Sequence, residues 1–172
     1  MSKRTGTYVT LEELLEEVGK DAARYFFVMR NPDSHLDFDM DLAKSESADN
    51  PIDYIQYAFA RISSILRQIE EGVDGYLDGE LPAFKLEIEK DLALKVGELE
   101  KVLIDACLRR EPYRVAAYAL ELATLFHQFY SSCRVLNETD QVKKDRLKLI
   151  MATKYSLQNV LNILGVSAPE RM

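Results

Sequence analysis

The residues best suited to chemistry lie on one face of the segment that follows Pro51. Tyr57, Arg61, Ser64 and Gln68 recur at steps of four, three and four, which places them on one side of a helix. An aromatic ring one turn before a guanidinium, with polar neighbours, can stack a nucleobase and donate hydrogen bonds to its edge. An ordinary solvated helix face is the alternative, and these residues alone leave it open.

A second set of the same kind occurs further along the chain. His127, Tyr130 and Arg134 fall on adjacent turns of the segment LFHQFYSSCRVL, beside apolar positions. Aromatic residues interleaved with arginine are typical of RNA-binding surfaces. The alternative is again a helix flank without a ligand.

Catalytic and metal-binding motifs are missing or incomplete. Asp37, Asp39 and Asp41 have the opening spacing of a calcium loop. The required glycine position, however, holds Leu42, and the position of the bidentate glutamate holds Ala48. There is also no Gly-rich phosphate loop, G-x-S-x-G or H-E-x-x-H motif. We therefore predict no metal site and interpret these acids as part of an extended segment whose charges discourage sheet pairing.

Length and composition indicate one domain with a small appendage. A chain of 172 residues, 47% of them hydrophobic, can bury a substantial core. Cys107 and Cys133 have no metal-ligand or disulfide spacing, so we predict that both are reduced core residues of a cytoplasmic protein. No apolar run reaches the roughly 18 residues of a membrane span, so no membrane partner is expected.

Charge is distributed unevenly along the chain. The net charge is -7, with 12 basic and 22 acidic residues in positions 1–104. Positions 105–172 carry 10 basic and 7 acidic residues. The C-terminal part can therefore present a basic face to a nucleic acid despite the acidic total.

Helical periodicity dominates residues 49–172. Asn50 and Pro51 are the N-cap and first-turn signals of a helix, and apolar residues then recur every three or four positions. Three further helices with similar stripes are predicted at about Lys85–Arg109, Pro112–Val135 and Asp140–Leu164. The segment EGVDGYLDGELP, between the helix that begins at Pro51 and the one that begins at about Lys85, is expected to be a loop. The fold class is therefore mainly α, with the four helices packed as a bundle.

Residues 1–48 are predicted to form a small mixed α/β segment. Thr10 opens a T-x-x-E capping box, and Gly19 marks the end of that short helix. A second helix is expected at about Asp21–Arg30, where NPDS stops it. The following HLDFDMDLA alternates polar and apolar residues, as an extended segment does.

Several stretches together resemble arginyl-tRNA synthetases over essentially the whole chain. They are MSKRTG, VTLEELLEEVGKDAARYFFVMR, SHLDFDMDLA, NPIDYIQYAFARI, LFHQFYSSCRVL and the ending LGVSAPERM. The resemblance implies that residues 49–172 are an α-helical anticodon-binding domain of the DALR type. Residues 1–48 would be the end of the class I catalytic region, with its connecting subdomain, so the chain is expected to be a C-terminal fragment.

The resemblance also implies an ATP-binding loop at the start of the chain. MSKR, that is Met1, Ser2, Lys3 and Arg4, resembles the family's KMSKS-type loop. Lys3 would be the catalytic residue that stabilises phosphate charge while the aminoacyl-adenylate forms. ATP and Mg²⁺ are implied for the full-length ligase. We expect this fragment to bind no cofactor and to be inactive alone, because the upstream fold that positions ATP and arginine is absent.

The same resemblance implies a cytosine pocket. Every arginine tRNA has cytosine at the middle of its anticodon, and cytosine offers an amino donor together with ring-nitrogen and carbonyl acceptors. Tyr57 and Arg61 match the family's pocket residues, and Met172 would supply main-chain contacts to the same base.

The resemblance also implies further tRNA contacts, and the chain departs from the family pattern at two positions. Tyr130 matches a family aromatic that packs on the anticodon stem-loop, and His127 and Arg134 are additional candidates. Phe59 stands where the family usually has histidine, and Asp53 where an apolar or aromatic residue is common. Because Phe59 lies on the apolar stripe, we expect local repacking and an intact pocket.

Arginine tRNA is thus the expected partner of a monomer that binds no DNA. One alternative is a non-catalytic helical module that docks on a protein partner, and another is the anticodon-binding part of a different class I synthetase, such as the cysteine enzyme. A module would expose an apolar patch, whereas an anticodon-binding domain needs an aromatic and basic surface. The Tyr57 and Arg61 pair with the ERM ending favours arginine.

Overall fold

The described part of the chain is helical throughout its regular structure. The computed structural model describes residues 9–35, 37–45, 47, 49–69, 76 and 82–172, and these contain no strand. The helices are α1 (Leu11–Val28), α2 (Met40–Lys44), α3 (Pro51–Arg67), α5 (Glu87–Gly97), α6 (Leu99–Arg109), α7 (Tyr113–Ser132) and α8 (Asp140–Leu164). None of the helices in these residues is long and apolar enough to cross a membrane.

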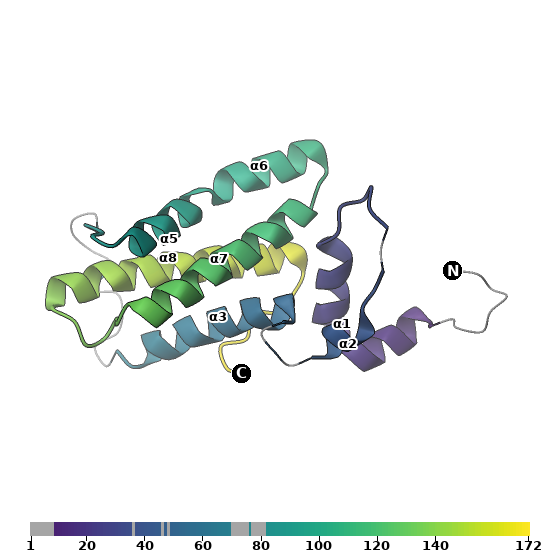
Figure 1. Ribbon diagram of the computed structural model, residues 1–172, viewed down its shortest axis with the longest axis horizontal. Helices are drawn as coiled ribbons and strands as arrows, with labels where there is room; N and C mark the ends of the chain where they lie inside the picture. Colours follow the sequence, from purple (N-terminus) through teal and green to yellow (C-terminus); the bar gives the residue numbers. More distant parts are fainter. Residues whose placement is uncertain (1–8, 36, 46, 48, 70–75, 77–81) are drawn as a thin grey trace.

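The core lies between α3, α5, α7 and α8. Figure 1 shows α3, α7 and α8 running side by side, with α5 against α7 and α8, and all of these pairs are in contact. Several large core residues are fully buried, among them Ile55, Phe59, Leu92, Leu122, Phe126, Leu147 and Leu157. Burial of each such side chain contributes roughly 1.5–3 kcal/mol, so this packing is the main source of stability. The predicted bundle is therefore confirmed.

Helix α3 forms where its capping signals predict. The Asn50 side chain accepts a hydrogen bond from the Ile52 N–H, and Pro51 occupies the first turn. The Asn50 amide also donates to the carbonyl of Ser45 at 2.9 Å, which ties the end of α2 to the start of α3. The predicted stripe is buried, since Ile52, Ile55, Phe59 and Ile62 are at most 1% exposed.

The segment before α3 differs from the sequence prediction at one element. HLDFDMDLA was expected to be extended, but Met40–Lys44 forms α2, so the α/β assignment is wrong for the described residues. The Asp39 carboxylate caps this helix by accepting from the Leu42 N–H at 2.9 Å. A local cap therefore outweighs a short alternation. The predicted break at Gly19 is confirmed, because its φ of 76° lies outside helical geometry within α1.

Two predictions in the region of α5 and α6 are wrong. The single helix expected at about Lys85–Arg109 is divided at Glu98, directly after Gly97. Cys107 is exposed, whereas Cys133 is buried as predicted, and its burial raises the pKa of the Cys133 thiol. The reason for the Cys107 error is that α6 lies at the edge of the bundle and buries only Ala106, so its outward side chains face solvent.

A buried ion pair ties α5 to α8. The Arg146 guanidinium donates to the Glu89 carboxylate at 2.7 Å, to Glu138 at 3.0 Å and to the carbonyl of Arg134 at 2.6 Å. Glu89 also accepts two backbone N–H bonds at the start of α5. Burial by itself raises the pKa of Glu89, but these backbone bonds and Arg146 outweigh it and hold the pKa below its ordinary value.

We expect Glu89→Gln to lower the free energy of unfolding at neutral pH by about 3 kcal/mol, because it removes the buried partner of Arg146 and leaves that charge paired only with the partly exposed Glu138. Since folding lowers the pKa of Glu89, its contribution is complete above the unfolded-state pKa of about 4.3 and is lost as pH falls through the folded-state pKa. Urea unfolding followed by circular dichroism, from about pH 7 to pH 3, measures both effects. Glu87→Gln is the matched control, because Glu87 is exposed and pairs only at the surface with Lys90. Equal acid sensitivity in wild type and Glu89→Gln would contradict this account.

Candidate nucleic-acid interface

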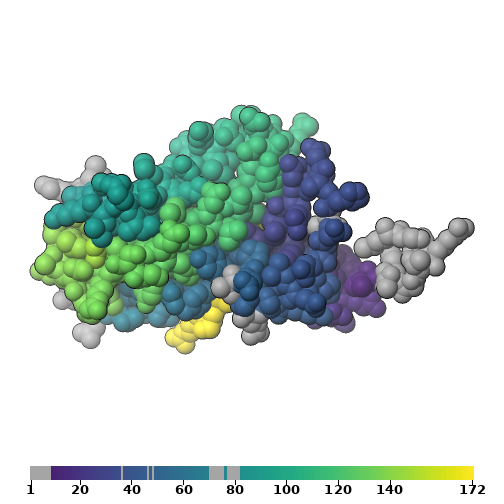
Figure 2. Space-filling view, viewed as in Figure 1, coloured from purple at the N-terminus to yellow at the C-terminus, as the bar shows by residue number. Residues whose placement is uncertain are grey.

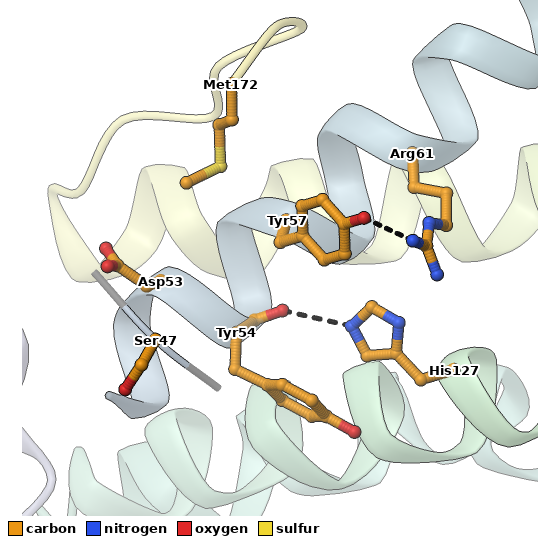
Figure 3. Close-up of a pocket in the computed structure, with 7 residues that line it drawn as sticks. All are labelled: Ser47, Asp53, Tyr54, Tyr57, Arg61, His127 and Met172. Atoms are coloured by element: carbon orange, nitrogen blue, oxygen red, sulfur yellow. Dashed lines mark hydrogen bonds between the residues drawn. The ribbon is translucent and has the colours of Figure 1, made fainter. Parts of the chain in front are cut away.

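An open cleft of about 730 Å³ lies between the start of α3, the middle of α7 and the end of the chain. Its lining consists of Ser47, Asp53, Tyr54, Tyr57, Arg61, His127 and Met172 (Figure 3). Four of these side chains come from α3, which presents them on the side opposite its buried stripe. The fold therefore brings Tyr57 and Arg61 together with His127 and Met172, which lie far from them in the sequence.

The Arg61 guanidinium lies between two tyrosine rings. Its Cζ is 4.4 Å from the centroid of the Tyr57 ring and 4.5 Å from that of the Tyr130 ring. Arg61 also donates a hydrogen bond to the Tyr57 hydroxyl (Figure 3). Tyr57 also stacks on His127, with centroids 5.8 Å apart and ring planes inclined by 21°. Because Tyr57 and Tyr130 are 44% and 39% exposed, the rings form an accessible stacking surface.

His127 supplies a hydrogen-bond acceptor at the base of the cleft. Its Nε2 lies 3.2 Å from the carbonyl oxygen of Tyr54 (Figure 3), and because a carbonyl can only accept, Nε2 carries the hydrogen. Burial lowers the pKa of His127, the hydrogen bond to Tyr54 opposes this, and the nearby Arg61 charge lowers the pKa further. The imidazole is therefore neutral at pH 7, which leaves Nδ1 as an acceptor.

The remaining predicted positions extend the surface along α3. Ser64 and Gln68 line a hollow next to the cleft, together with Arg61 and Tyr130. Arg134 is exposed and lines a third hollow, which shares Gln68 and Tyr130 with the second. Arg134 therefore does not reach the cleft itself, but it lies on the same continuous surface.

Two lining residues were missed by the sequence analysis. Tyr54 packs against His127, with ring centroids 4.4 Å apart, and it lies one helical turn before Tyr57. The helical spacing that pointed to Tyr57 could therefore have found Tyr54 as well. Ser47 lies in the connection between α2 and α3, where no periodic pattern marks it.

Two predicted loops lie wholly or largely outside the residues that the structure describes. The expected ATP-loop residues Met1, Ser2, Lys3 and Arg4 lie outside the described residues, as does most of the predicted loop EGVDGYLDGELP. In the part of the chain that the structure describes, no group of three or more His, Cys, Asp or Glu side chains is arranged to hold a metal ion.

The sequence that carries most of the cleft matches a known protein family. Residues 55–172 match the DALR anticodon binding domain, which is more than half of the chain. The chain belongs to the DALR anticodon-binding domain family. The cleft and its arginine–tyrosine stack lie within the matched part of this DALR domain, apart from Ser47, Asp53 and Tyr54.

Relatives and solved structures extend the match to the residues before the DALR domain. The arginine–tRNA ligase of Desulfitobacterium hafniense is 53% identical over 178 residues, which cover 100% of this chain and 31% of that ligase. A Campylobacter jejuni structure assigned as an arginyl-tRNA synthetase has a TM-score of 0.89 at 29% identity, covering 99% of this chain and 37% of that one. For the Thermus thermophilus arginyl-tRNA synthetase the TM-score is 0.76 at 28% identity, with 99% and 29% covered. The chain thus spans about a third of the length of these proteins.

The two positions at which the resemblance implied departures, Phe59 and Asp53, have different surroundings in the structure. Phe59 is 1% exposed and lies on the core stripe, as expected, with the Lys154 ammonium 5.2 Å from its ring centroid. Asp53 instead lines the cleft. Phe59 therefore belongs to the core behind the cleft, while Asp53 forms part of the wall of the cleft.

The neutral state of His127 can be measured directly. The chain has two histidines, so His35→Gln leaves His127 as its only imidazole. We expect the NMR resonances of this ring to titrate below the ordinary histidine pKa of about 6.5, since burial disfavours the cation. Arg61→Gln, which removes a neighbouring positive charge, should raise that pKa. A pKa at or above about 6.5 in the His35→Gln protein would contradict the assignment of Nδ1 as an acceptor.

Proposed function

We propose that this chain binds the anticodon loop of arginine tRNA as the C-terminal part of an arginine–tRNA ligase. The observation that carries the proposal is the exposed stack in which Arg61 lies between Tyr57 and Tyr130, above the acceptor of His127. Stacked aromatics with a guanidinium are what unpaired bases require. The relatives that match the whole chain are named arginine–tRNA ligases, which supports arginine over the cysteine enzyme.

The chemistry of the cleft suits cytosine. In the proposed complex the base stacks on Tyr57, and Nδ1 of His127 accepts a hydrogen bond from the cytosine amino group. Arg61 has five N–H donors and uses one on the Tyr57 hydroxyl, so others remain for the ring nitrogen and carbonyl of the base. Uracil carries a carbonyl in place of the amino group, so its oxygen would face Nδ1 of His127, and neither atom could donate a hydrogen. This arrangement therefore favours cytosine at the middle of the anticodon.

The neighbouring residues contact the rest of the anticodon stem-loop. Tyr130 packs on the nucleotide beside the bound cytosine, and Arg134, further along the same surface, binds phosphate. Met172 lies at the mouth of the cleft and covers the base from the solvent side. Because most of the attraction is to phosphates, the binding should fall steeply as salt rises. We also expect it to be weak, because the chain as a whole carries a net charge of -7.

Ligation itself is assigned to a longer protein, because this chain spans 31% of the ligases that it matches. ATP and Mg²⁺ would be bound there, with Met1–Arg4 as part of the ATP site and Lys3 as its catalytic lysine. We expect this chain alone to give no arginine-dependent ATP–pyrophosphate exchange, since adenylate formation requires positioned ATP and arginine. We place the ligase in the cytoplasm, as a monomer that does not bind DNA.

The protein-docking alternative has one observation in its favour. Ile104 and Leu108, one turn apart on α6, are 50% and 78% exposed, and the exposed Cys107 lies beside them. Figure 1 shows α6 on the side of the bundle away from α3. Leu108→Ala therefore separates tRNA binding from protein docking. It should leave tRNA binding unchanged, because this face lies away from the cleft.

We expect Tyr57→Ala and Arg61→Ala each to weaken binding of arginine tRNA by about 1–3 kcal/mol, because each removes a contact to the cytosine. Fluorescence anisotropy with labelled tRNA at one fixed salt concentration gives the dissociation constants. Stability should hardly change, since both side chains lie opposite the buried stripe.

Two matched controls and one altered tRNA make this test specific. Tyr155→Ala removes an exposed tyrosine from α8, and Arg109→Ala removes an exposed arginine from α6, and neither residue lines the cleft. Both should bind like wild type. With a tRNA whose middle anticodon base is U, the losses caused by Tyr57→Ala and Arg61→Ala should largely disappear. Equal losses on both tRNAs would mean that the cytosine is recognised elsewhere.

A further inference from the structure

The segment of residues 165–172, called here the closing segment, turns back from α8 across α3. Helix α8 ends at Leu164 and is capped by Gly165, whose φ of 68° reverses the chain, and the N–H of Val166 donates to the Leu161 carbonyl at 2.9 Å. Figure 2 shows this segment in yellow on the surface beside α3, and Figure 3 shows Met172 above Tyr57. The path of the closing segment therefore determines whether Met172 reaches the cleft.

One carboxylate of α1 holds the closing segment in place. Asp21 accepts hydrogen bonds from the backbone N–H of Ser167 at 3.1 Å, from the Ser167 hydroxyl and from the Gln56 amide at 3.0 Å. The Gln56 amide also donates to the Ser167 carbonyl at 3.0 Å. Asp21 thus joins α1, α3 and the closing segment at a single point.

A second residue of α1 closes over the turn that starts this segment. The Arg24 side chain packs on the Gly165 backbone, where a Cβ atom would meet Nη1 of Arg24. Gly165 is favoured here for its left-handed φ, whereas the exposed end of the Arg24 side chain can move aside. Two residues of α1, three positions apart, thus contact the first part of the closing segment, and Asp21 is the one that bonds to it.

The far end of the closing segment has weaker support. Glu170 pairs with Lys154 at 2.8 Å, and its carbonyl accepts a hydrogen bond from Arg67 at 3.0 Å. The Glu170 side chain is 61% exposed, and exposed ion pairs contribute little because water and salt screen them. By contrast, Gln56 is 7% exposed, so its hydrogen bonds to Asp21 and Ser167 are shielded better than the contacts of Glu170, while the direct bonds between Ser167 and Asp21 lie at the surface.

We propose that Asp21 is a positioning residue of the anticodon site, which acts through Ser167 and Gln56 to place the closing segment and hold Met172 at the mouth of the cleft. Asp21 precedes the part of the chain that matches the DALR domain, residues 55–172. The complete binding unit therefore includes α1. The effect on tRNA rests on the function proposed above, whereas the effect on the position of Met172 does not.

The first experiment follows Met172 without tRNA. With ¹³C-methyl methionine labelling, the Met172 methyl signal is assigned by its loss in Met172→Leu. In Asp21→Ala we expect this signal to move toward the position of an unstructured methionine, because the closing segment leaves the Tyr57 ring. Asp21→Asn, which keeps one acceptor oxygen, should move it less and serves as the second variant if Asp21→Ala does not fold. Glu16→Ala, which removes an exposed acid from the same helix, should leave it unchanged.

The second experiment measures the consequence for binding. We expect Asp21→Ala to weaken binding of arginine tRNA by about 2- to 30-fold, less on a tRNA with U at the middle of the anticodon, while Glu16→Ala binds normally. An unmoved Met172 signal in folded Asp21→Ala would overturn the inference. So would wild-type tRNA binding by Asp21→Ala in an assay in which Tyr57→Ala binds more weakly. If Tyr57→Ala has no effect, the proposed function fails, and the Met172 signal alone then decides whether Asp21 positions the segment.

Discussion

The packing of α3 against α7 and α8 determines which side chains of this protein can reach a nucleotide. Burial of Ile55, Phe59 and Ile62, each at most 1% exposed, fixes the rotation of α3 about its axis. Once that rotation is fixed, Tyr57 and Arg61 must face outward, because they lie on the opposite side of the helix. A rotation of α3 large enough to turn this face toward the core would bury the Arg61 charge, at a high cost in free energy. The core and the candidate site are therefore two consequences of one constraint.

The electrostatics of the cleft depend on how Arg61 is held. Among the described residues Arg61 forms no salt bridge, and its charge is stabilised by the faces of Tyr57 and Tyr130. Aromatic faces keep the guanidinium in place without neutralising it, so its charge and its N–H groups stay available to a ligand. The neutral His127 beside it adds an acceptor. A chain with a net charge of -7 can in this way present a local site for a polyanion.

The closing segment shows that the site extends beyond one family domain. The predicted division into residues 1–48 and 49–172 stays a prediction, but hydrogen bonds cross it, because Gln56 and Ser167 both donate to Asp21. The Tyr25 hydroxyl also donates to the carbonyl of Ala116 in α7, at 3.1 Å. These contacts make the position of α1 part of the geometry of the cleft. A description of the DALR domain that begins at residue 55 omits them.

Local signals in the sequence determined the helices and the faces that they present. Asn50 and Pro51 start α3, Gly19 interrupts α1, and the spacing of Tyr57 and Arg61 places both on the side away from the core, since each effect acts within a few residues. The resemblance to arginyl-tRNA synthetases singled out Tyr57, Arg61, Tyr130 and Met172 as one site. Only the tertiary structure decided the exposure of Cys107, the packing of His127 on Tyr54, and the bond between Asp21 and Ser167, which are 146 positions apart. Those features depend on which helices lie side by side and how each is rotated, and periodicity within one helix contains no information about its neighbours.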